Sequence, residues 1–559
     1  MNAPARQNSV DYTGRTGWLH GTGVGILSVL WRSLLKYWPM TLDRVSLEVA
    51  WSRLISIVNE QAAALMRTSV TPVVREAGDL SACLYDARGR MLAQATTGTP
   101  GHINSISDIV FEVLRRYPPE TIRPGDIFIT NDAWLTSGQL NDLTVITPVF
   151  DRSGILVGFL ANCCHHYDVG GRIRSAEARD IFEEGLYIPL LKLYEAGEPN
   201  ETLFAMLRGN VRHPELVLGD LEAQIAGNEV GGAALLELLE ELGLEGLGPL
   251  ADEIIFRSER AFRERISLVP PGTYRAELYG DGYDEPIHLR VRLEVGDGEV
   301  VADFSGSSPQ SRYGINVVLN YTRAYTVFAL KCALAPDIPN NTGFFTPIKV
   351  RAPEGSILNP VRPAPVSARA TVGHLIPSLI FRALAPAVPD RVMAAGADGL
   401  WIIHFYGERD AKGPFSFTLM LSGGMGARPN KDGLSATAFP SGISGVSAEV
   451  VEATSPLLIL EKELREGSGG AGRHQGGLGQ RLRVRVRTGK PFWFAPITQR
   501  VHHPAPGLVG GGDGAPGRVV LLPDGEELRT KQQRLLDPGV EILLETPGGG
   551  GYGPADSPG

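Results

Sequence analysis

Apolar and polar residues alternate most regularly in the segment IHLRVRLEV, where every second residue from Ile287 to Val295 is apolar. Such a period of two is typical of a strand with one buried face. Gly296-Asp297-Gly298 follows as a tight-turn sequence, and the pattern resumes in EVVADF. The sequence therefore predicts a β-hairpin here.

Helical periodicity dominates two other regions. Between residues 43 and 69 apolar side chains recur every three or four positions, at Leu47, Trp51, Leu54, Val58, Ala62 and Leu65. Residues 220–265 show the same spacing, which includes AALLELLEEL. Shorter helices are predicted around YTRAYTVFALKCAL and VGHLIPSLIFRALA.

Short strand patterns fill the intervening and final segments. DLSACLYDARGRMLAQ predicts two strands joined by a turn at residues 86–89, and residues 126–162 predict further strands with a turn at Ser153-Gly154. The last hundred residues are rich in glycine and contain strand patterns such as QRLRVRVRTG and EILLE. We therefore predict a mixed α+β, multi-domain protein with β-hairpin-rich sheets packed against helices.

Changes in residue composition and periodicity along the chain predict four parts. Residues 1–39 form an extension, and residues 40–269 form an N-terminal domain with a helical region. Residues 270–465 form a central mixed α/β domain that begins at a Pro-Pro pair, and residues 466–559 form a glycine-rich C-terminal β region.

Charge and composition limit the partners. The formal net charge is −9, whereas nucleic-acid binding calls for a basic footprint, so no nucleic acid is expected. The apolar stretch near residues 18–38 is interrupted by His20, Arg32 and Lys36, so it predicts no membrane span. The four cysteines form no C-x-x-C pair, and reduced thiols in a cytoplasmic protein are the simplest interpretation.

The chain carries no recognisable nucleotide-binding motif of its own. No G-x-x-x-x-G-K-[ST] occurs, and the two G-x-G-x-x-G matches, at 467–472 and 548–553, do not open a predicted helix.

The segment ANCCHHYDVGG, residues 161–171, concentrates groups that can carry chemistry. Two strands of a hairpin can bring Asp142, at the start of one, close to His165 and His166, at the end of the other. A carboxylate and an imidazole meeting at a strand end make a divalent-metal site possible. The alternative is a loop held by hydrogen-bonded polar side chains, and spacing alone leaves both interpretations open.

From Met40 onward the sequence resembles the hydantoinase B, 5-oxoprolinase and acetone carboxylase alpha-subunit family. The resemblance rests on an ordered series of motifs: REAGDLSACLYDARGRMLAQ, TPGHINSI, NDAWLTSGQLNDLTVITPVF, HHYDVGG, IFEEGLYIP, DFSGSSPQ, NTGFFTPIKVRAPEGSILNP, ARATVG, GGMGARPNKDG, SGGAGRHQGGLG and TPGGGGYG. Because residues 1–39 lie outside it, we expect that extension to be poorly packed or Met40 to be the native start.

The resemblance implies a subunit that works with an ATP-binding partner of the hydantoinase A type in a hetero-oligomer. ATP on the partner would phosphorylate a poorly electrophilic carbonyl, which fits the missing nucleotide motif. Lactamase-type members then hydrolyse the activated cyclic amide, and carboxylase members carboxylate a ketone. A divalent metal is also implied, with ligands that match Asp142 and His165 here.

One position departs from the family pattern, because Gln139 stands in GQLND where the family has histidine. A glutamine carbonyl is a poorer zinc ligand than imidazole, whereas manganese and magnesium accept oxygen donors more readily. The substitution predicts a changed metal (Mn, Zn or Mg remain candidates), a weaker site or a subunit without catalysis.

Further site candidates surround these ligands. His166 and Asp168 are candidates for orienting the site or moving protons, and Glu183 and Glu184 for a carboxylate base. His102 in GHINS lines the same pocket or simply packs. Asp132, with Asn131, is expected beside the loop that carries Asp142.

Three functions remain open at this point. The chain length favours a subunit of an ATP-dependent cyclic-amide hydrolase, of the hydantoinase or 5-oxoprolinase type. The second possibility is a subunit of an ATP-dependent ketone carboxylase, of the acetone or acetophenone type. The third is a non-catalytic paralogue within such a complex, which Gln139 would explain.

Overall fold

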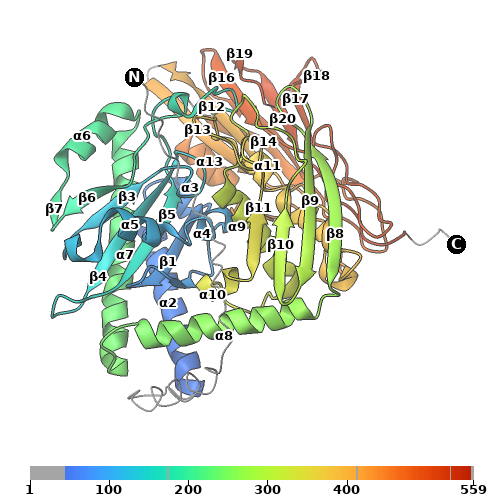
Figure 1. Ribbon diagram of the computed structural model, residues 1–559. Helices are drawn as coiled ribbons and strands as arrows, with labels where there is room; N and C mark the ends of the chain where they lie inside the picture. The colour runs from blue at the N-terminus through green and yellow to red at the C-terminus, as the bar shows by residue number, and fades with distance from the viewer. Residues whose placement is uncertain (1–43, 173–174, 411–412, 529–530, 556–559) are drawn as a thin grey trace, which may run out of the picture. The chain divides into compact units, whose positions relative to one another are not determined.

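The computed structural model describes residues 44–172, 175–410, 413–528 and 531–555. The predicted extension, residues 1–39, lies outside the described residues. From Trp51 onward the chain forms one compact unit that contains helices and four multi-stranded sheets (Figure 1). The predicted mixed α+β class is therefore confirmed, whereas the domain boundaries after residues 269 and 465 stay a prediction.

A seven-stranded sheet carries the candidate site. Its strand order is β2 (Met91–Gln94), β1 (Leu80–Asp86), β5 (Leu156–His165), β4 (Asp142–Phe150), β3 (Ile127–Thr130), β6 (Leu191–Glu195) and β7 (Glu198–Pro199). Strands β4 and β5 form the hairpin that the sequence predicts, with its turn at residues 151–155. Both central strands are buried almost throughout, because helices cover them.

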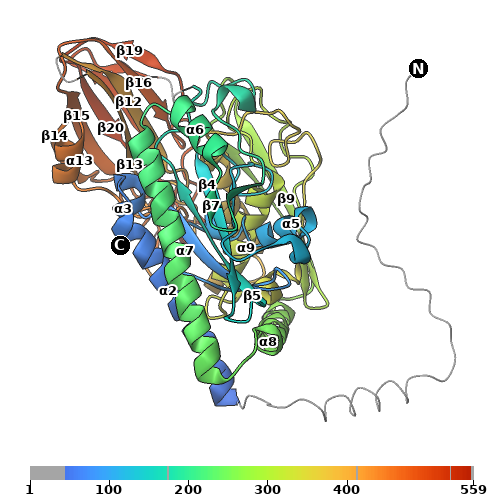
Figure 2. The same cartoon turned by 90° about the vertical axis from the view of Figure 1, so that its left-hand side faces the viewer.

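Two long helices lie along one face of this sheet, α2 (Arg44–Thr68) and α7 (Pro214–Leu242), as Figure 2 shows. Buried amides tie them to the strands. Gln61 of α2 donates to Asn228 of α7 at 2.7 Å, and Asn162 of β5 donates to the same oxygen at 2.7 Å. Gln224 donates to the Leu143 carbonyl at 2.8 Å. These bonds fix the sheet against α7, since buried polar groups without partners are costly.

The other face of the sheet meets short elements from distant parts of the chain. Helix α4 (Pro100–Ile103) contacts β1 and β5 directly, α9 (Leu319–Leu334) packs on α4, and α11 (Ala370–Gly373) packs on α9. Further helices and 3-10 turns are α3 (Pro72–Arg75), α5 (Ile109–Arg116), η2 (Pro119–Thr121), η3 (Ile181–Glu183), α6 (Glu201–Asn210), α10 (Thr342–Phe345), η4 (Pro389–Arg391) and α13 (Ala448–Thr454).

The second sheet contains the β-hairpin that the alternating pattern from Ile287 onward predicts. Its order is β11 (Ile348–Arg351), β10 (Glu299–Asp303), β9 (Ile287–Gly296) and β8 (Gly272–Gly280). The apolar face of β9 is buried as predicted, and helices α8 (Gly248–Ser267) and α12 (Ile376–Leu384) pack against this sheet.

The last two sheets share a core of their own. One has the order β13 (Gly413–Leu421), β12 (Trp401–Arg409), β16 (Phe492–Ile497) and β19 (Arg534–Leu536). The other has the order β14 (Leu457–Leu464), β15 (Gln480–Val486), β20 (Glu541–Glu545), β17 (Arg518–Leu522) and β18 (Glu526–Glu527). Aromatic side chains of β12 and β16 pack against aliphatic side chains of β15 and β20 in this core.

Glycine-rich segments join these sheets through direct backbone contact. Gly477 donates to the Met425 carbonyl at 2.9 Å, and Gly549 donates to the Gly477 carbonyl at 2.9 Å. A Cβ on Gly477 would lie 2.0 Å from the Leu434 carbonyl oxygen, so this packing requires glycine. The glycine-rich C-terminal region of the sequence thus has a structural role.

No helix in the described ranges is long and apolar enough to cross a membrane.

Candidate active site

The candidate site lies where strands β1, β5 and β4 run side by side. Asp142 and His165 are direct cross-strand partners, so both side chains project from the same face. Asp79, just before β1, accepts the backbone N–H of His165 on its carbonyl at 3.1 Å. All three side chains are buried in the sheet face that meets α4.

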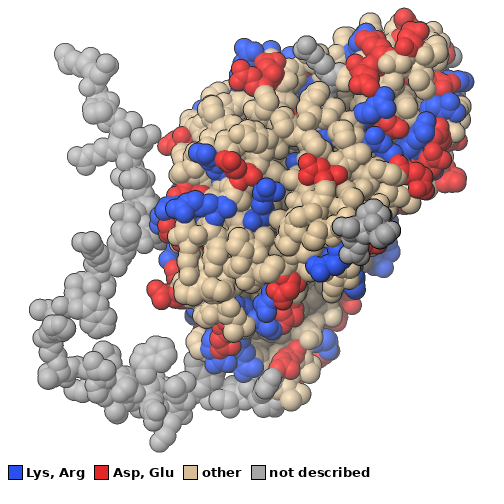
Figure 3. Space-filling view, turned by 90° about the vertical axis from the view of Figure 1, so that its right-hand side faces the viewer, with Lys and Arg blue, Asp and Glu red and all other residues tan. Residues whose placement is uncertain are grey.

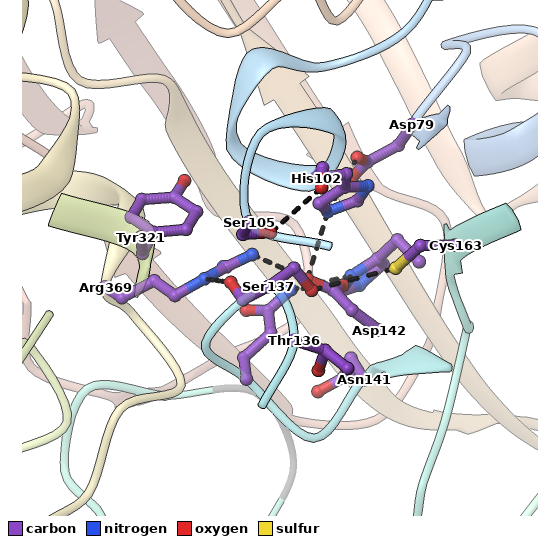
Figure 4. A network of polar contacts seen from close by, with 12 residues as sticks. Asp79, His102, Ser105, Thr136, Ser137, Asn141, Asp142, Cys163, Tyr321 and Arg369 are labelled. Carbon is purple, nitrogen blue, oxygen red and sulfur yellow. Dashed lines mark hydrogen bonds and ion pairs between the residues drawn. The ribbon is translucent and has the colours of Figure 1, made fainter. Parts of the chain in front are cut away.

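One carboxylate oxygen of Asp142 is held by donors from three other segments (Figure 4). Oδ2 accepts from Ser137 Oγ at 2.6 Å, lies 3.0 Å from His102 Nε2, and accepts from Arg369 Nη2 at 2.5 Å. Arg369 also donates to the Ser137 carbonyl and stacks over the Tyr321 ring with a centroid distance of 4.3 Å. The orientation of the carboxylate is thus fixed from outside the hairpin.

Charge controls the protonation of this carboxyl group. Burial alone would raise the pKa of Asp142, but the nearby charges of His102 and Arg369, with hydrogen bonds from His102 and His165, hold it well below its ordinary value. Asp142 is therefore an anion in a buried setting.

The other oxygen of Asp142 faces a triangle of possible ligands. Gln139 Nε2 lies 2.7 Å from Asp142 Oδ1 and 2.9 Å from His165 Nδ1, and the last two atoms are 2.9 Å apart. Neighbouring ligands of an octahedral ion at 2.0–2.1 Å are about 3 Å apart. The triangle formed by these three side-chain atoms therefore has the size of one triangular face of an octahedral coordination shell.

The Gln139 side chain provides a further test of whether an ion fits. Its Oε1 is buried without a hydrogen-bond partner. Because amide oxygen and nitrogen can exchange places by a flip, Oε1 can instead face Asp142 and His165. Three acceptor atoms then converge, an arrangement that a cation stabilises. The residues present therefore fit a divalent ion that accepts oxygen ligands.

Carboxylates, imidazoles and thiols do not form such a site by themselves. Within the described ranges no group of three or more His, Cys, Asp or Glu side chains is arranged to hold a metal. Gln139 is thus needed to complete the set, and the guanidinium of Arg369 adds a fixed positive charge beside it. The amide oxygen of Gln139 favours manganese or magnesium over zinc, and the charge of Arg369 weakens the binding of any cation.

His102 and His166 occupy opposite positions relative to the site. His102, on α4, contacts Asp142 and lies 3.6 Å from Asp79 through its Nε2. His166 follows His165 on the strand, and alternation turns it to the other face, where Nε2 lies 2.9 Å from Gln224 Oε1 on α7. Burial lowers the pKa of His166, which favours its neutral form. Its role in orienting the site or moving protons stays a prediction.

Three predicted acidic residues are paired with arginines outside the triangle. Asp168 binds Arg212 at 2.7 Å, and Glu183 binds Arg172 at 3.0 Å. Asp132 forms an ion pair with Arg362 and accepts from Tyr187 at 2.9 Å. These ion pairs link separate segments of the chain, and a catalytic role for the three residues stays a prediction.

Glu184 differs from its neighbour Glu183. Its side chain is buried, and Oε1 accepts the N–H groups of Val366 and Ser367 at 2.7 and 2.9 Å, whereas Oε2 has no partner. Burial raises the pKa of Glu184 to about 8 against these two hydrogen bonds. The group is therefore a neutral acid at pH 7 that can donate a proton.

Two pockets meet at His165. One is mostly apolar, is lined by residues of α3, β13 and the loop before α13, and has about 540 Å³ of empty space, its open mouth included. The other is polar, has about 420 Å³ measured in the same way, and is lined by Asn141, Asp168, Glu184 and Arg212 among others. His165, Tyr167 and Thr418 line both pockets.

Sequence reasoning missed Asp79, Ser137 and Arg369 as members of the site. Asp79 and Arg369 both lie in motifs that carry the family resemblance, GDLSACLYD and ARATVG. Those motifs were the available signal, but the partner of Arg369 lies 227 residues away along the chain.

The comparisons with known proteins agree with this fold. A family model described as hydantoinase B/oxoprolinase matches residues 43–555. An uncharacterized protein of Methanocaldococcus jannaschii is 32% identical, with 92% of this chain and 91% of that protein covered. The 5-oxoprolinase 1 of Arabidopsis thaliana is 29% identical, and the chain spans 42% of its length.

A solved structure extends the likeness to three dimensions. The ATP-dependent caprolactamase of Pseudomonas jessenii has a TM-score of 0.84 at 27% identity, with 92% of each chain covered. Together with the match of the family model over nearly the whole chain, this shows that the chain belongs to the hydantoinase B/oxoprolinase family.

Proposed function

We propose that the chain is the hydrolytic subunit of an ATP-dependent cyclic-amide hydrolase and acts with a hydantoinase A-type subunit that binds ATP. The observation that carries the proposal is the buried Gln139–Asp142–His165 triangle, whose imidazole lines two pockets. The likeness of the whole chain to an ATP-dependent caprolactamase, over 92% of both chains, supports this class of reaction.

In the proposed reaction the partner phosphorylates the amide oxygen, and water then adds to the activated carbon. A divalent ion held by Gln139, Asp142 and His165 would supply a Lewis acid or lower the pKa of a bound water. Ser137, His102 and Arg369 keep Asp142 ionised and fixed in orientation. This fixed geometry limits the reorganisation that the reaction requires.

Glu184 supplies the proton in this proposal. Its unpartnered Oε2 belongs to a residue that lines the polar pocket with His165, and its raised pKa keeps the carboxyl group protonated at neutral pH. When the carbon–nitrogen bond breaks, the leaving ring nitrogen takes this proton, and Glu184 regains one from solvent. The acyl phosphate that remains is hydrolysed by a second water molecule, which releases inorganic phosphate and the ring-opened amino acid.

The surface charge is consistent with a small-molecule substrate. On the face drawn in Figure 3, basic and acidic side chains are interspersed, and neither sign gathers in one large patch. Together with the net charge of −9, this favours a neutral organic substrate over a polyanion.

The test is to co-express the chain with the hydantoinase A-type subunit of its own organism and to measure ADP release with ring-opened product for several cyclic amides. Asp142→Ala and His165→Ala should abolish product formation, whereas Glu245→Gln, at an exposed position between α7 and α8, should not. Carboxylated product that requires bicarbonate, without ring opening, would contradict the proposal in favour of a ketone carboxylase.

A further inference from the structure

We propose that the site selects an uncharged cyclic amide whose methylene ring enters the apolar pocket, and that it discriminates against amides bearing a carboxylate. This inference rests on the proposed function, because it identifies the substrate class of the same site.

The apolar pocket provides a surface for a hydrocarbon ring. Its walls include Val73, Ala77, Phe417, Leu419, Met420 and Val446, and Phe417, Leu419 and Met420 are each less than 9% exposed. These side chains offer dispersion contacts and desolvation of methylene groups, and none of the six can neutralise a negative charge. A ring of methylene groups therefore matches this pocket better than a ring with a charged substituent.

The polar pocket offers no free positive charge to a substrate carboxylate, because both arginines among its described lining residues are already paired. Arg212 is bound to Asp168 at 2.7 Å and also donates to the Gly171 carbonyl. Arg172 is bound to Glu183 at 3.0 Å. A substrate carboxylate would have to break one of these pairs or approach Asp168, so binding it is unfavourable.

The residues shared by both pockets fix the orientation of the substrate. His165, Tyr167 and Thr418 lie at the junction, so the reacting amide belongs there, beside the Gln139–Asp142–His165 triangle. The ring then extends toward β13 and the loop before α13, while the carbonyl faces the Gln139–Asp142–His165 triangle. The specificity surface is thus contributed by β13, on a different sheet from Asp142.

The test compares 2-pyrrolidinone with 5-oxoproline, which have the same five-membered lactam ring and differ by the carboxylate alone. With the co-expressed ATP-binding subunit, we expect kcat/KM for 2-pyrrolidinone to exceed that for 5-oxoproline by at least tenfold. Equal or better turnover of 5-oxoproline overturns the inference and leaves the proposed function standing. If no cyclic amide supports ATP-dependent ring opening, the proposed function fails, and this inference fails with it.

A variant pair tests the location of the ring. Val446 is only half-buried, so Val446→Arg can place a guanidinium at the apolar pocket, and Val446→Met adds length without charge. The arginine variant should shift the preference toward 5-oxoproline by at least tenfold, and the methionine variant should not. Unchanged preference in folded Val446→Arg overturns the assignment. If that variant does not fold, Val73→Arg, also half-buried, provides the same comparison.

Discussion

At the scale of single residues, the two oxygens of Asp142 have different tasks. Oδ2 takes the hydrogen bonds of Ser137 and Arg369, which leaves Oδ1 for the triangle with Gln139 and His165. A ligand held in this way binds an ion without first having to be ordered, because its outer partners fix its direction. The weak member of the set is the neutral amide of Gln139.

We expect Gln139→His to increase the amount of divalent metal that stays bound after dialysis and to shift preference toward zinc, since imidazole is the better zinc ligand. Asp142→Ala and His165→Ala should remove the metal. Elemental analysis of the four proteins, prepared in parallel, measures this. Equal metal content in the parent and in both alanine variants would locate the ion elsewhere.

Arg369 is expected to oppose the ion while stabilising the fold. Replacing it with glutamine leaves Asp142 buried without its guanidinium, so the free energy of unfolding should fall by about 3–5 kcal/mol. Removing the neighbouring positive charge should increase the affinity for Mn²⁺, because Ser137 still fixes the direction of the carboxylate. Calorimetric titration with Mn²⁺ and urea unfolding with and without it test both effects, with Arg369→Lys as the charge-retaining control. Weaker Mn²⁺ binding in Arg369→Gln would contradict this account.

Glu184 should make stability depend on pH. Its pKa is raised from 4.5 to about 8 in the folded protein by burial, so the folded chain keeps a proton that the unfolded chain releases above about pH 4.5. Stability therefore falls as pH rises from about 4.5 to about 8. Glu184→Gln removes this loss. The free energy of unfolding of the variant should therefore increase relative to that of the parent by about 3–5 kcal/mol as pH rises from 5 to 8.

Urea unfolding of both proteins at several pH values in this range provides the measurement. Glu183→Gln is the matched control, because Glu183 is adjacent, more exposed and bound to Arg172. Parallel stability profiles for the parent and Glu184→Gln would show that Glu184 ionises normally.

At the scale of elements, local pattern predicts much of the fold. The alternating segments became β9 and β10, and the predicted hairpin became β4 and β5 with Asp142 opposite His165. A short connection and a buried face fix the register of such a hairpin from nearby residues alone. The pairing of β1 with β5, which brings Asp79 to the site, joins segments that are distant in sequence, so no local period contains it.

The glycine-rich segments are elements of another kind, in which backbone packs on backbone. Gly477→Ala should lower the free energy of unfolding by about 1–3 kcal/mol or more, because its Cβ would lie 2.0 Å from the Leu434 carbonyl oxygen. Gly445→Ala is the control, since a Cβ there has no neighbour within 4 Å. Denaturant unfolding measures the difference, and equal stability of the two variants would show that the packing tolerates a methyl group.

At the scale of the whole molecule, the site depends on contacts that the sequence does not reveal without its fold. Arg369 reaches Asp142 across 227 residues, and Met420 of β13 and Ala77 before β1 line the same pocket. Composition and periodicity describe neighbours along the chain, whereas these contacts arise from the packing of separate sheets. The motifs that carry the family resemblance name several of these segments but give no geometry.

Partnership is the prediction that belongs to this scale. The sequence has no G-x-x-x-x-G-K-[ST] motif, yet the proposed reaction requires ATP. We therefore expect the purified chain alone to show no ATP binding in equilibrium dialysis and no ATP turnover with any cyclic amide. Adding the hydantoinase A-type subunit should produce both, and His165→Ala in the same complex should lose ring opening while ATP binding persists, because the triangle and the nucleotide would lie on different subunits. Substrate-dependent ATP turnover by the chain alone would place the nucleotide on this subunit and contradict the proposed division of labour.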